Sequence, residues 1–133
     1  MKLLNPQGSK GHSAPTLLIV DDDDTIRKML KTVFSRFKYR VILAENGQEG
    51  VDYYRQNSAK VNLVMLDWKM PIMDGKNAFK EMRRMNPDLK IVLMSGYVEQ
   101  QELDQLLDKN SQFIAKPFTI DTVIATVEAM LQS

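Results

Sequence analysis

Four consecutive aspartates follow the first apolar run of the sequence, and their carboxylates are the first groups that could do chemistry. They occupy positions 21–24 in the stretch LLIVDDDDTI. Carboxylates that converge on one point require a cation, and a set of oxygen ligands without His or Cys suits Mg²⁺ or a similar hard ion. We therefore interpret part of this acidic run as a candidate metal site.

Three further polar residues stand at the ends of other apolar runs. Asp67 closes VNLVMLD, Ser95 closes KIVLMS, and Lys116 follows SQFIA. An ammonium and a hydroxyl can each hold an oxygen of a phosphoryl group, and positioning with charge neutralisation is most of what phosphoryl transfer requires. Because an aspartate can act as a nucleophile and form an acyl phosphate, Asp67 is the best-placed candidate acceptor.

The elements that must position these residues alternate along the chain. Short β-branched runs, typical of strands covered on both faces, are separated by longer stretches with apolar residues at helical spacing. This alternation predicts an α/β domain with a parallel, doubly wound sheet, whose ligand site lies outside the carboxyl ends of the strands. The expected strands are 16–20, 40–44, 61–66, 90–95 and 111–115, and the expected helices are 24–37, 46–57, 76–85, 99–110 and 119–131.

The first helix illustrates how we assign side chains to faces. Asp24 is expected at the N-cap, where its carboxylate would accept hydrogen bonds from free helix N–H groups. Arg27 is expected on a solvated face, as is the Arg83–Arg84 pair of the third helix. The residues of the first helix that are expected to face the core are Ile26, Met29, Leu30, Val33 and Phe37.

The composition is that of an ordinary globular domain. The chain has 133 residues, enough for one domain, and its 18 basic and 17 acidic residues give a net charge of +1, which predicts no nucleic-acid or membrane partner. Cysteine is absent, which excludes disulfides and thiolate metal sites. Residues 1–14 are interpreted as a flexible tail or linker and not as a secretory signal. No apolar run is long enough to span a membrane, and a cytoplasmic location is expected.

Four segments together resemble the receiver domain of two-component response regulators. They are LLIVDDDDTIRKML, VMLDWKMPIMDG, IVLMSGY and FIAKPF, in the order of that family and at similar separations. The resemblance covers about residues 15–131. It implies a flavodoxin-like (βα)5 fold with parallel strands in the order 2-1-3-4-5, and a receiver domain over residues 15–133.

The resemblance also implies a role for each candidate metal ligand. Asp21 and Asp22 correspond to the acidic pair of the family, and Asp67 corresponds to the phosphoacceptor. Together with the backbone carbonyl of Lys69, they would bind Mg²⁺, or Mn²⁺ in its place. Asp22 would contact the ion directly and Asp21 through water.

Three other residues correspond to positions that respond to phosphorylation in the family. Ser95 would move towards the phosphoryl group, Phe113 would then pack inward, and Lys116 would bind a phosphoryl oxygen next to a cis Lys116–Pro117 peptide. The surface expected to change is formed by the fourth helix, the fifth strand and the fifth helix. Tyr97 is expected to flank the acyl phosphate and to restrict attacking water.

The implied function is that of a phosphoacceptor in a two-component phosphorelay. A phosphohistidine on a histidine kinase or a histidine phosphotransfer protein would donate to Asp67, and a protein target would bind the changed surface. The domain would hydrolyse its own acyl phosphate and would not turn over an outside substrate. Because the chain ends after the last expected helix, it would act through a partner, relay phosphoryl groups, or be the receiver of a larger hybrid kinase.

The acidic run also fits other protein classes. Asp21, Asp23 and Thr25 form D-x-D-x-T, which resembles the first motif of haloacid-dehalogenase phosphatases, with Asp21 as nucleophile and Asp23 as acid/base of a small Mg-dependent phosphatase. The short chain and the otherwise unexplained LDWKMPIMDG segment argue against this assignment. An EF-hand is excluded because Ile26 stands where the calcium loop needs glycine. The intact set of polar residues argues against an interaction module that has lost phosphorylation.

Overall fold

Five parallel strands form one sheet in the order β2-β1-β3-β4-β5, which confirms the predicted fold class. The computed structural model describes residues 14–96 and 100–133. Tyr97 and nearly all of the expected N-terminal tail therefore lie outside the described residues. The strands are β1 (Thr16–Val20), β2 (Arg40–Ala44), β3 (Leu63–Asp67), β4 (Lys90–Ser95) and β5 (Ser111–Ala115).

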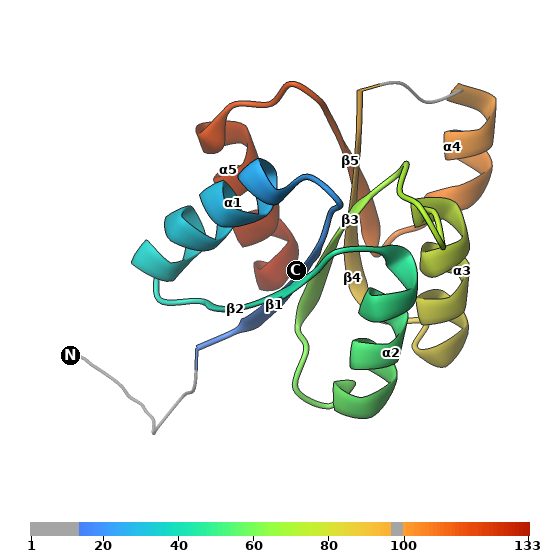
Figure 1. Cartoon of the computed structure of the whole chain (residues 1–133), viewed down its shortest axis with the longest axis horizontal. Coiled ribbons are helices and arrows are strands. Elements are labelled where there is room, and N and C mark those ends of the chain that lie inside the picture. Colours follow the sequence, from blue (N-terminus) through green and yellow to red (C-terminus); the bar gives the residue numbers. More distant parts are fainter. Residues whose placement is uncertain (1–13, 97–99) are drawn as a thin grey trace.

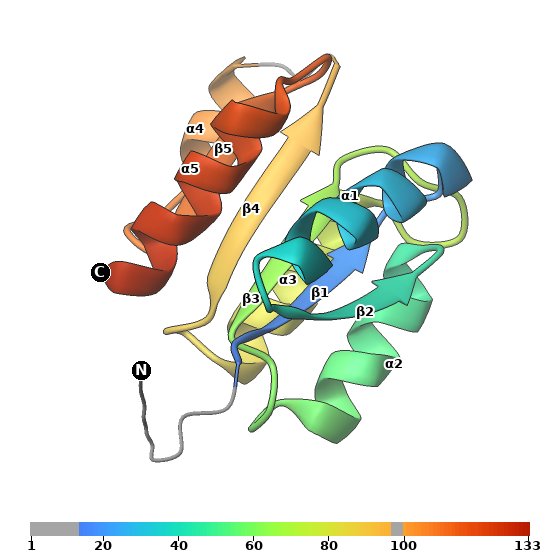
Figure 2. The same ribbon diagram turned by 90° about the vertical axis from the view of Figure 1, so that its left-hand side faces the viewer.

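Helices cover both faces of the sheet, as parallel strands require. One layer is formed by α1 and α5, and the other by α2, α3 and α4 (Figures 1 and 2). Within residues 14–96 and 100–133, none of the helices combines the length and the apolarity needed to cross a bilayer. The helices are α1 (Asp24–Arg36), α2 (Gly47–Asn57), α3 (Gly75–Met85), α4 (Gln100–Leu106) and α5 (Ile120–Gln132).

The central strands supply side chains to two separate cores. Leu17 and Ile19 of β1 pack in the cluster beneath α1 and α5, whereas Leu18 and Val20 pack in the cluster beneath α2, α3 and α4. The alternating strand geometry sends successive side chains to opposite faces. Each fully buried aliphatic side chain contributes about 1.5–3 kcal/mol, so the positions of the strand ends are set by a rigid interior.

The first helix differs from its sequence prediction at both ends. Asp23, not Asp24, is the N-cap, and its carboxylate accepts hydrogen bonds from the N–H groups of Thr25 and Ile26. Phe37 is the C-cap residue and is 50 % exposed, because the chain leaves the helix there.

The buried stripe of α1 also differs from the prediction. It is formed by Arg27, Leu30 and Phe34, while Met29 is exposed. These buried residues follow the spacing i, i+3 and i+7, which lies on one helix face. The expectation of a solvated Arg27 is therefore wrong.

Arg83 of α3 is likewise not a solvated residue. Its guanidinium donates to the carbonyl oxygen of Leu89 at 2.6 Å and to the carboxylate of Asp108 at 2.8 and 3.1 Å. It also lies 5.2 Å from the ring centroid of Phe79. Arg84 is exposed as expected and pairs with Glu81.

The fourth helix is shorter than predicted, because α4 ends at Leu106. Beyond it, the Asp108 carboxylate accepts a hydrogen bond from the Asn110 N–H at 3.0 Å, and the Asp108 N–H donates to Ser111 Oγ at 2.7 Å. Such local bonds compete with helical ones and favour a turn. Leu103 is buried, and Leu106 and Leu107 pack against the same cluster as expected.

Candidate functional site

The predicted site residues meet at the rim formed by the carboxyl ends of the strands. In the strand register Asp67 pairs with Met94, and Ser95 pairs with Ala115, the residue before Lys116. Asp21 directly follows β1, and its N–H donates to the carbonyl of Ala44 at the end of β2. Parallel pairing therefore brings residues that are distant in the sequence to one edge of the sheet.

The ammonium of Lys116 connects two of the carboxylates. Its Nζ donates to Asp21 Oδ2 at 2.9 Å and to Asp67 Oδ1 at 3.1 Å. These partners are 95 and 49 residues away along the chain. The convergence that the sequence predicted is thus present in the fold.

Three carboxylates gather closely enough to share one ion. Asp21, Asp22 and Asp67 each offer an oxygen, and these oxygens lie within 4.8 Å of one another. Asp21 is fully buried and Asp67 is 6 % exposed, whereas Asp22 is exposed. An oxygen-only set that is open to solvent on one side fits Mg²⁺, which retains several of its waters.

The two members of the acidic pair differ in how their oxygens are used. Asp21 Oδ1 accepts a hydrogen bond from the Asp23 N–H at 2.9 Å, and Asp21 Oδ2 accepts one from Lys116. Both oxygens of Asp21 are therefore engaged by the protein, whereas Asp22 is exposed to solvent. The roles of Asp22 as the direct ligand and of Asp21 as a ligand through water stay predictions.

Burial and charge perturb the titration of the cluster. Burial, followed by the nearby charge of Asp21, raises the pKa of Asp67 to about 7, although Lys116 acts in the opposite direction. Burial by itself would lower the pKa of Lys116, but its hydrogen bond to Asp21 and the charges of both aspartates outweigh that effect and raise it. Two clustered carboxylates with a single ammonium between them favour the binding of a further cation, because like charges that lie close together repel.

The other two aspartates of the acidic run have structural partners. Asp23 caps α1, as described above. Asp24 accepts from Arg27 Nη2 at 2.9 Å and pairs with Lys28 Nζ at 3.0 Å. The hydrogen bond from Lys28, more than any other contact, lowers the pKa of Asp24. The four carboxylates thus divide into two at the candidate metal site and two at the helix start.

The backbone after Asp67 is fixed by a close approach of Gly75. The Gly75 N–H donates to the carbonyl of Trp68 at 2.8 Å, and Asp74 caps α3 through the N–H of Asn77. A Cβ atom at Gly75 would lie 2.1 Å from the carbonyl oxygen of Asp67. The turn before α3 therefore requires glycine at position 75, where the chain packs directly against the backbone of Asp67.

The two predicted switch residues, Ser95 and Phe113, lie on β4 and β5, and Lys116 directly follows β5. Ser95 is buried, and its carbonyl accepts a hydrogen bond from the Lys116 N–H at 2.8 Å. Phe113 is half-buried and packs against the core on the α2–α3–α4 side. The Lys116–Pro117 peptide is cis, as the resemblance implied. The switch roles of Ser95 and Phe113, and the metal contact of the Lys69 carbonyl, stay predictions.

Arg27 is a buried residue at the site that the sequence reasoning missed. Its Nη1 donates to the backbone carbonyl of Asp21 at 2.7 Å. The available signal was its spacing from Leu30 and Phe34, which places it on the buried stripe of α1.

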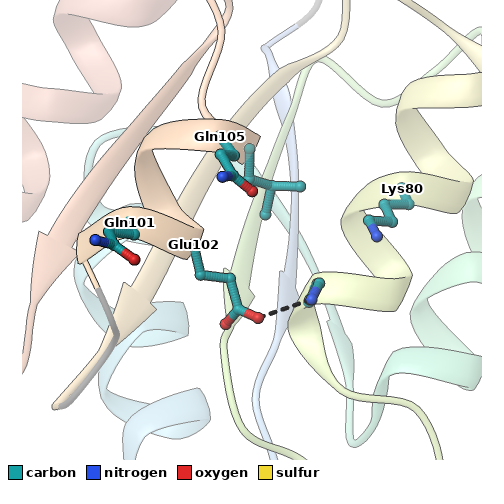
Figure 3. Close-up of a pocket in the computed structure, with 6 residues that line it drawn as sticks. Lys80, Gln101, Glu102 and Gln105 are labelled. Carbon is teal, nitrogen blue, oxygen red and sulfur yellow. Dashed lines mark hydrogen bonds and ion pairs between the residues drawn. The ribbon is translucent and has the colours of Figure 1, made fainter.

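Two of the hollows in the described part of the chain lie beside α4 and beside Lys116. One, of about 370 Å³, separates α3 from α4, and the ion pair between Lys76 and Glu102 crosses it at 2.7 Å (Figure 3). Its lining contains none of the rim carboxylates, so we assign it no part in phosphoryl chemistry. The other, of about 390 Å³, borders the site itself and is lined by Ile26, Met29, Lys116, Pro117 and Phe118.

The doubly wound sheet and its rim define an α/β domain whose clustered carboxylates and lysine lie at the carboxyl ends of its strands. Residues 17–128 match the response regulator receiver domain family, and the chain belongs to that family. It is a receiver domain of the two-component type. The match lends no support to the haloacid-dehalogenase assignment, in which Asp23, here the cap of α1, would be the acid/base.

Known relatives include both short and long proteins. The chain is 33 % identical over 120 residues to the chemotaxis protein CheY of Bacillus subtilis, covering 89 % of this chain and 98 % of that protein. It is 32 % identical over 118 residues to the sensor kinase CckA of Brucella abortus, covering 88 % of this chain but only 12 % of the kinase. Among solved structures, the CheX–CheY–BeF3–Mg+2 complex of Borrelia burgdorferi contains a chain that matches with a TM-score of 0.81 at 27 % identity, covering 86 % of this chain and 87 % of that one.

Proposed function

We propose that the domain accepts a phosphoryl group from a phosphohistidine onto Asp67 in a Mg²⁺-dependent reaction. The observation that carries this proposal is the position of the Lys116 ammonium, in hydrogen-bond contact with both Asp21 and Asp67. A cation in that position can hold a transferred phosphoryl group next to the carboxylate that receives it.

The donor set supports a divalent cation at the same place. Asp21, Asp22 and Asp67 supply carboxylate oxygens, and the Lys69 carbonyl would complete the protein ligands. When bound, Mg²⁺ would neutralise the clustered carboxylates and bind an oxygen of the phosphoryl group. Mn²⁺ has the same preference for oxygen ligands and would substitute.

The transfer step follows from the chemistry of Asp67. An ionised carboxylate oxygen attacks phosphorus, the P–N bond breaks, and its electron pair leaves with the imidazole of the donor. Lys116 holds one phosphoryl oxygen, and the Ser95 hydroxyl donates to another. The signal ends by hydrolysis of the acyl phosphate: water attacks the phosphorus, the P–O bond to Asp67 breaks, and the carboxylate is restored. The domain is therefore a phosphoacceptor that catalyses its own phosphorylation and dephosphorylation.

Two residues on β4 and β5 would transmit the change. Ser95 terminates β4 and Phe113 lies on β5, so movement of Ser95 towards a phosphoryl group would let Phe113 pack inward. The α4-β5-α5 face would then change shape and bind a downstream protein target. A charge added at Asp67 would in this way shift the balance between two packing arrangements.

The apolar hollow beside Lys116 supports a docking place for the phosphodonor. Ile26 and Met29 of α1 face Pro117 and Phe118 across it. A helix of a histidine kinase or histidine phosphotransfer protein could bury its apolar side chains there and present its histidine to Asp67. The receiver domain over residues 15–133 and the cytoplasmic location are parts of this proposal.

The direct test is to locate the modified carboxylate. The protein is treated with acetyl phosphate and Mg²⁺, and the acyl phosphate is mapped by mass spectrometry after borohydride reduction. We expect label on Asp67, loss of label in Asp67→Asn, and retained label in Asp23→Asn. Label on Asp21 that requires Asp23 would instead favour the phosphatase assignment and refute the proposal.

A further inference from the structure

Arg27 is a buried cation at the edge of the acidic cluster. Its side chain is 9 % exposed, and a guanidinium is always charged at physiological pH. A charge that is removed from water in this way needs close partners to offset the loss of hydration. The position of those partners indicates what the residue does.

The two partners lie at opposite ends of the loop between β1 and α1. Arg27 Nη1 donates to the carbonyl oxygen of Asp21 at 2.7 Å, and Nη2 donates to Asp24 Oδ1 at 2.9 Å. The carbonyl of Asp21 belongs to the peptide plane that joins Asp21 to Asp22. A hydrogen bond to that oxygen therefore sets the direction in which the backbone enters Asp22.

The rest of the loop is held at other points but not at this one. The N–H of Asp21 donates to Ala44, and the N–H of Asp23 donates to Asp21 Oδ1. Neither bond fixes the peptide plane before Asp22, and Asp22 is itself exposed. Arg27 thus supplies the contact that orients the peptide plane before Asp22.

We propose that Arg27 is a positioning residue for the divalent cation site: its bond to the Asp21 carbonyl orients Asp21 and Asp22 so that both carboxylates face Asp67. This inference rests on the proposed Mg²⁺ site and adds a residue that is not itself a ligand. Removing a contact that orients a metal ligand typically weakens metal binding by about 10-fold to 100-fold.

The sign of the effect separates this role from simple charge neutralisation. Arg27 is a cation near a cation site, so its charge alone repels Mg²⁺. If Arg27 served only to neutralise the aspartates, Arg27→Met would bind Mg²⁺ more tightly than the wild type. If Arg27 positions the ligands, the same substitution weakens binding despite the loss of a repelling charge.

Lys28 provides a matched control in the next position of the same helix. Its ammonium pairs with the same Asp24 at 3.0 Å, but its side chain is exposed. Lys28→Met therefore removes one positive charge and one partner of Asp24 while leaving the Asp21 carbonyl bond in place. Asp24→Asn removes the negative charge of the carboxylate that pairs with Arg27 and tests whether the bond to the Asp21 carbonyl is the one that matters.

The experiment is a Mg²⁺ titration of the full chain by isothermal titration calorimetry, with folding verified by circular dichroism. We expect the Mg²⁺ Kd of Arg27→Met to rise about tenfold, and those of Lys28→Met and Asp24→Asn to stay within about twofold of the wild type. Arg27→Lys, which keeps the charge but lacks the planar fork of the guanidinium, should weaken binding by a smaller factor and serves if the Met variant does not fold.

Two failures are distinguishable. Unchanged or tighter Mg²⁺ binding by folded Arg27→Met, or by Arg27→Lys in its place, overturns the positioning role and leaves the metal site intact. Absence of Mg²⁺ binding by the wild-type protein overturns the proposed metal site, and the role of Arg27 falls with it.

Discussion

Lys116 and Asp67 are 49 residues apart in the chain, yet Lys116 Nζ donates to Asp67 Oδ1 at 3.1 Å. The same ammonium contacts Asp21, so it is shared between the candidate phosphoacceptor and the acidic pair. A phosphoryl group arriving at Asp67 would compete for this ammonium. The site thereby couples the charge state of Asp67 to the position of the β5 end.

Asp67→Asn should stabilise the metal-free protein, and the gain should depend on pH. Burial raises the pKa of Asp67 from 3.8 to about 7, so ionising Asp67 in the folded state costs free energy that is fully present above pH 7 and vanishes below pH 4. Because this pKa already reflects the opposing effect of Lys116, we expect a net gain of up to about 4 kcal/mol at pH 8. Urea unfolding in EDTA at pH 8, 7, 6 and 5 measures it.

The control for this prediction is Asp88→Asn, at an exposed position of the α3–β4 loop. It should change the free energy of unfolding by less than about 0.5 kcal/mol at each pH. A gain for Asp67→Asn that is the same at pH 5 and pH 8 would mean that Asp67 ionises normally in the folded protein.

Gly75→Ala should destabilise the fold and disturb Asp67. The new methyl group would lie 2.1 Å from the Asp67 carbonyl oxygen, so the backbone of either β3 or the α3 start must shift. Overpacking of this kind typically costs about 1–3 kcal/mol or more, which thermal unfolding would register as a lower Tm. Gly96→Ala is the matched control, because its Cβ would approach Lys116 atoms only to 3.9 Å. Equal effects of the two substitutions would contradict the close approach at Gly75.

The fold and the rim residues could be predicted because they depend on patterns that are local or periodic. Strict alternation of strands and helices predicts a parallel sheet, and a parallel sheet brings Asp21, Asp67, Ser95 and Lys116 to one edge whatever the details of packing. The N-cap could not be predicted with the same accuracy, because four consecutive aspartates offer two equally suitable caps, Asp23 and Asp24. The choice depends on side-chain pairing within the first turns of the helix, since Asp24 pairs with Arg27 and Lys28.

Arg27 and Arg83 show why the predictions of solvated side chains failed for these two residues. A helical pattern assigns charged residues to solvent unless a partner is known, and the partners of Arg27 and Arg83 are mostly backbone carbonyl groups, which a sequence does not distinguish. Arg83 reaches Leu89 and Asp108, which are 6 and 25 residues away. Such contacts exist only after the loops that precede β4 and β5 have been placed.

Arg83→Met should therefore destabilise the protein more than a surface substitution would. It leaves the carbonyl of Leu89 and the carboxylate of Asp108 without their shared donor, and the loss of such hydrogen bonds at a partly exposed position costs about 1–3 kcal/mol. Arg84→Met, next to it on α3 and exposed, should cost less than about 0.5 kcal/mol. Urea unfolding of both variants provides the comparison. Similar midpoints for the two would place Arg83 among ordinary surface charges.

Lys116→Ala should leave the protein folded but separate phosphorylation from its structural effect. The substitution removes the ammonium that a phosphoryl group would draw away from Asp21. Modification of Asp67 would therefore no longer displace the end of β5. In NMR spectra recorded with acetyl phosphate or beryllofluoride, we expect amide shifts near Asp67 to persist and those on the α4-β5-α5 face to shrink several-fold. Lys109→Ala, exposed in the loop before β5, should retain both sets of shifts. A full response of the α4-β5-α5 face in Lys116→Ala would remove Lys116 from the coupling and assign it to Ser95 alone.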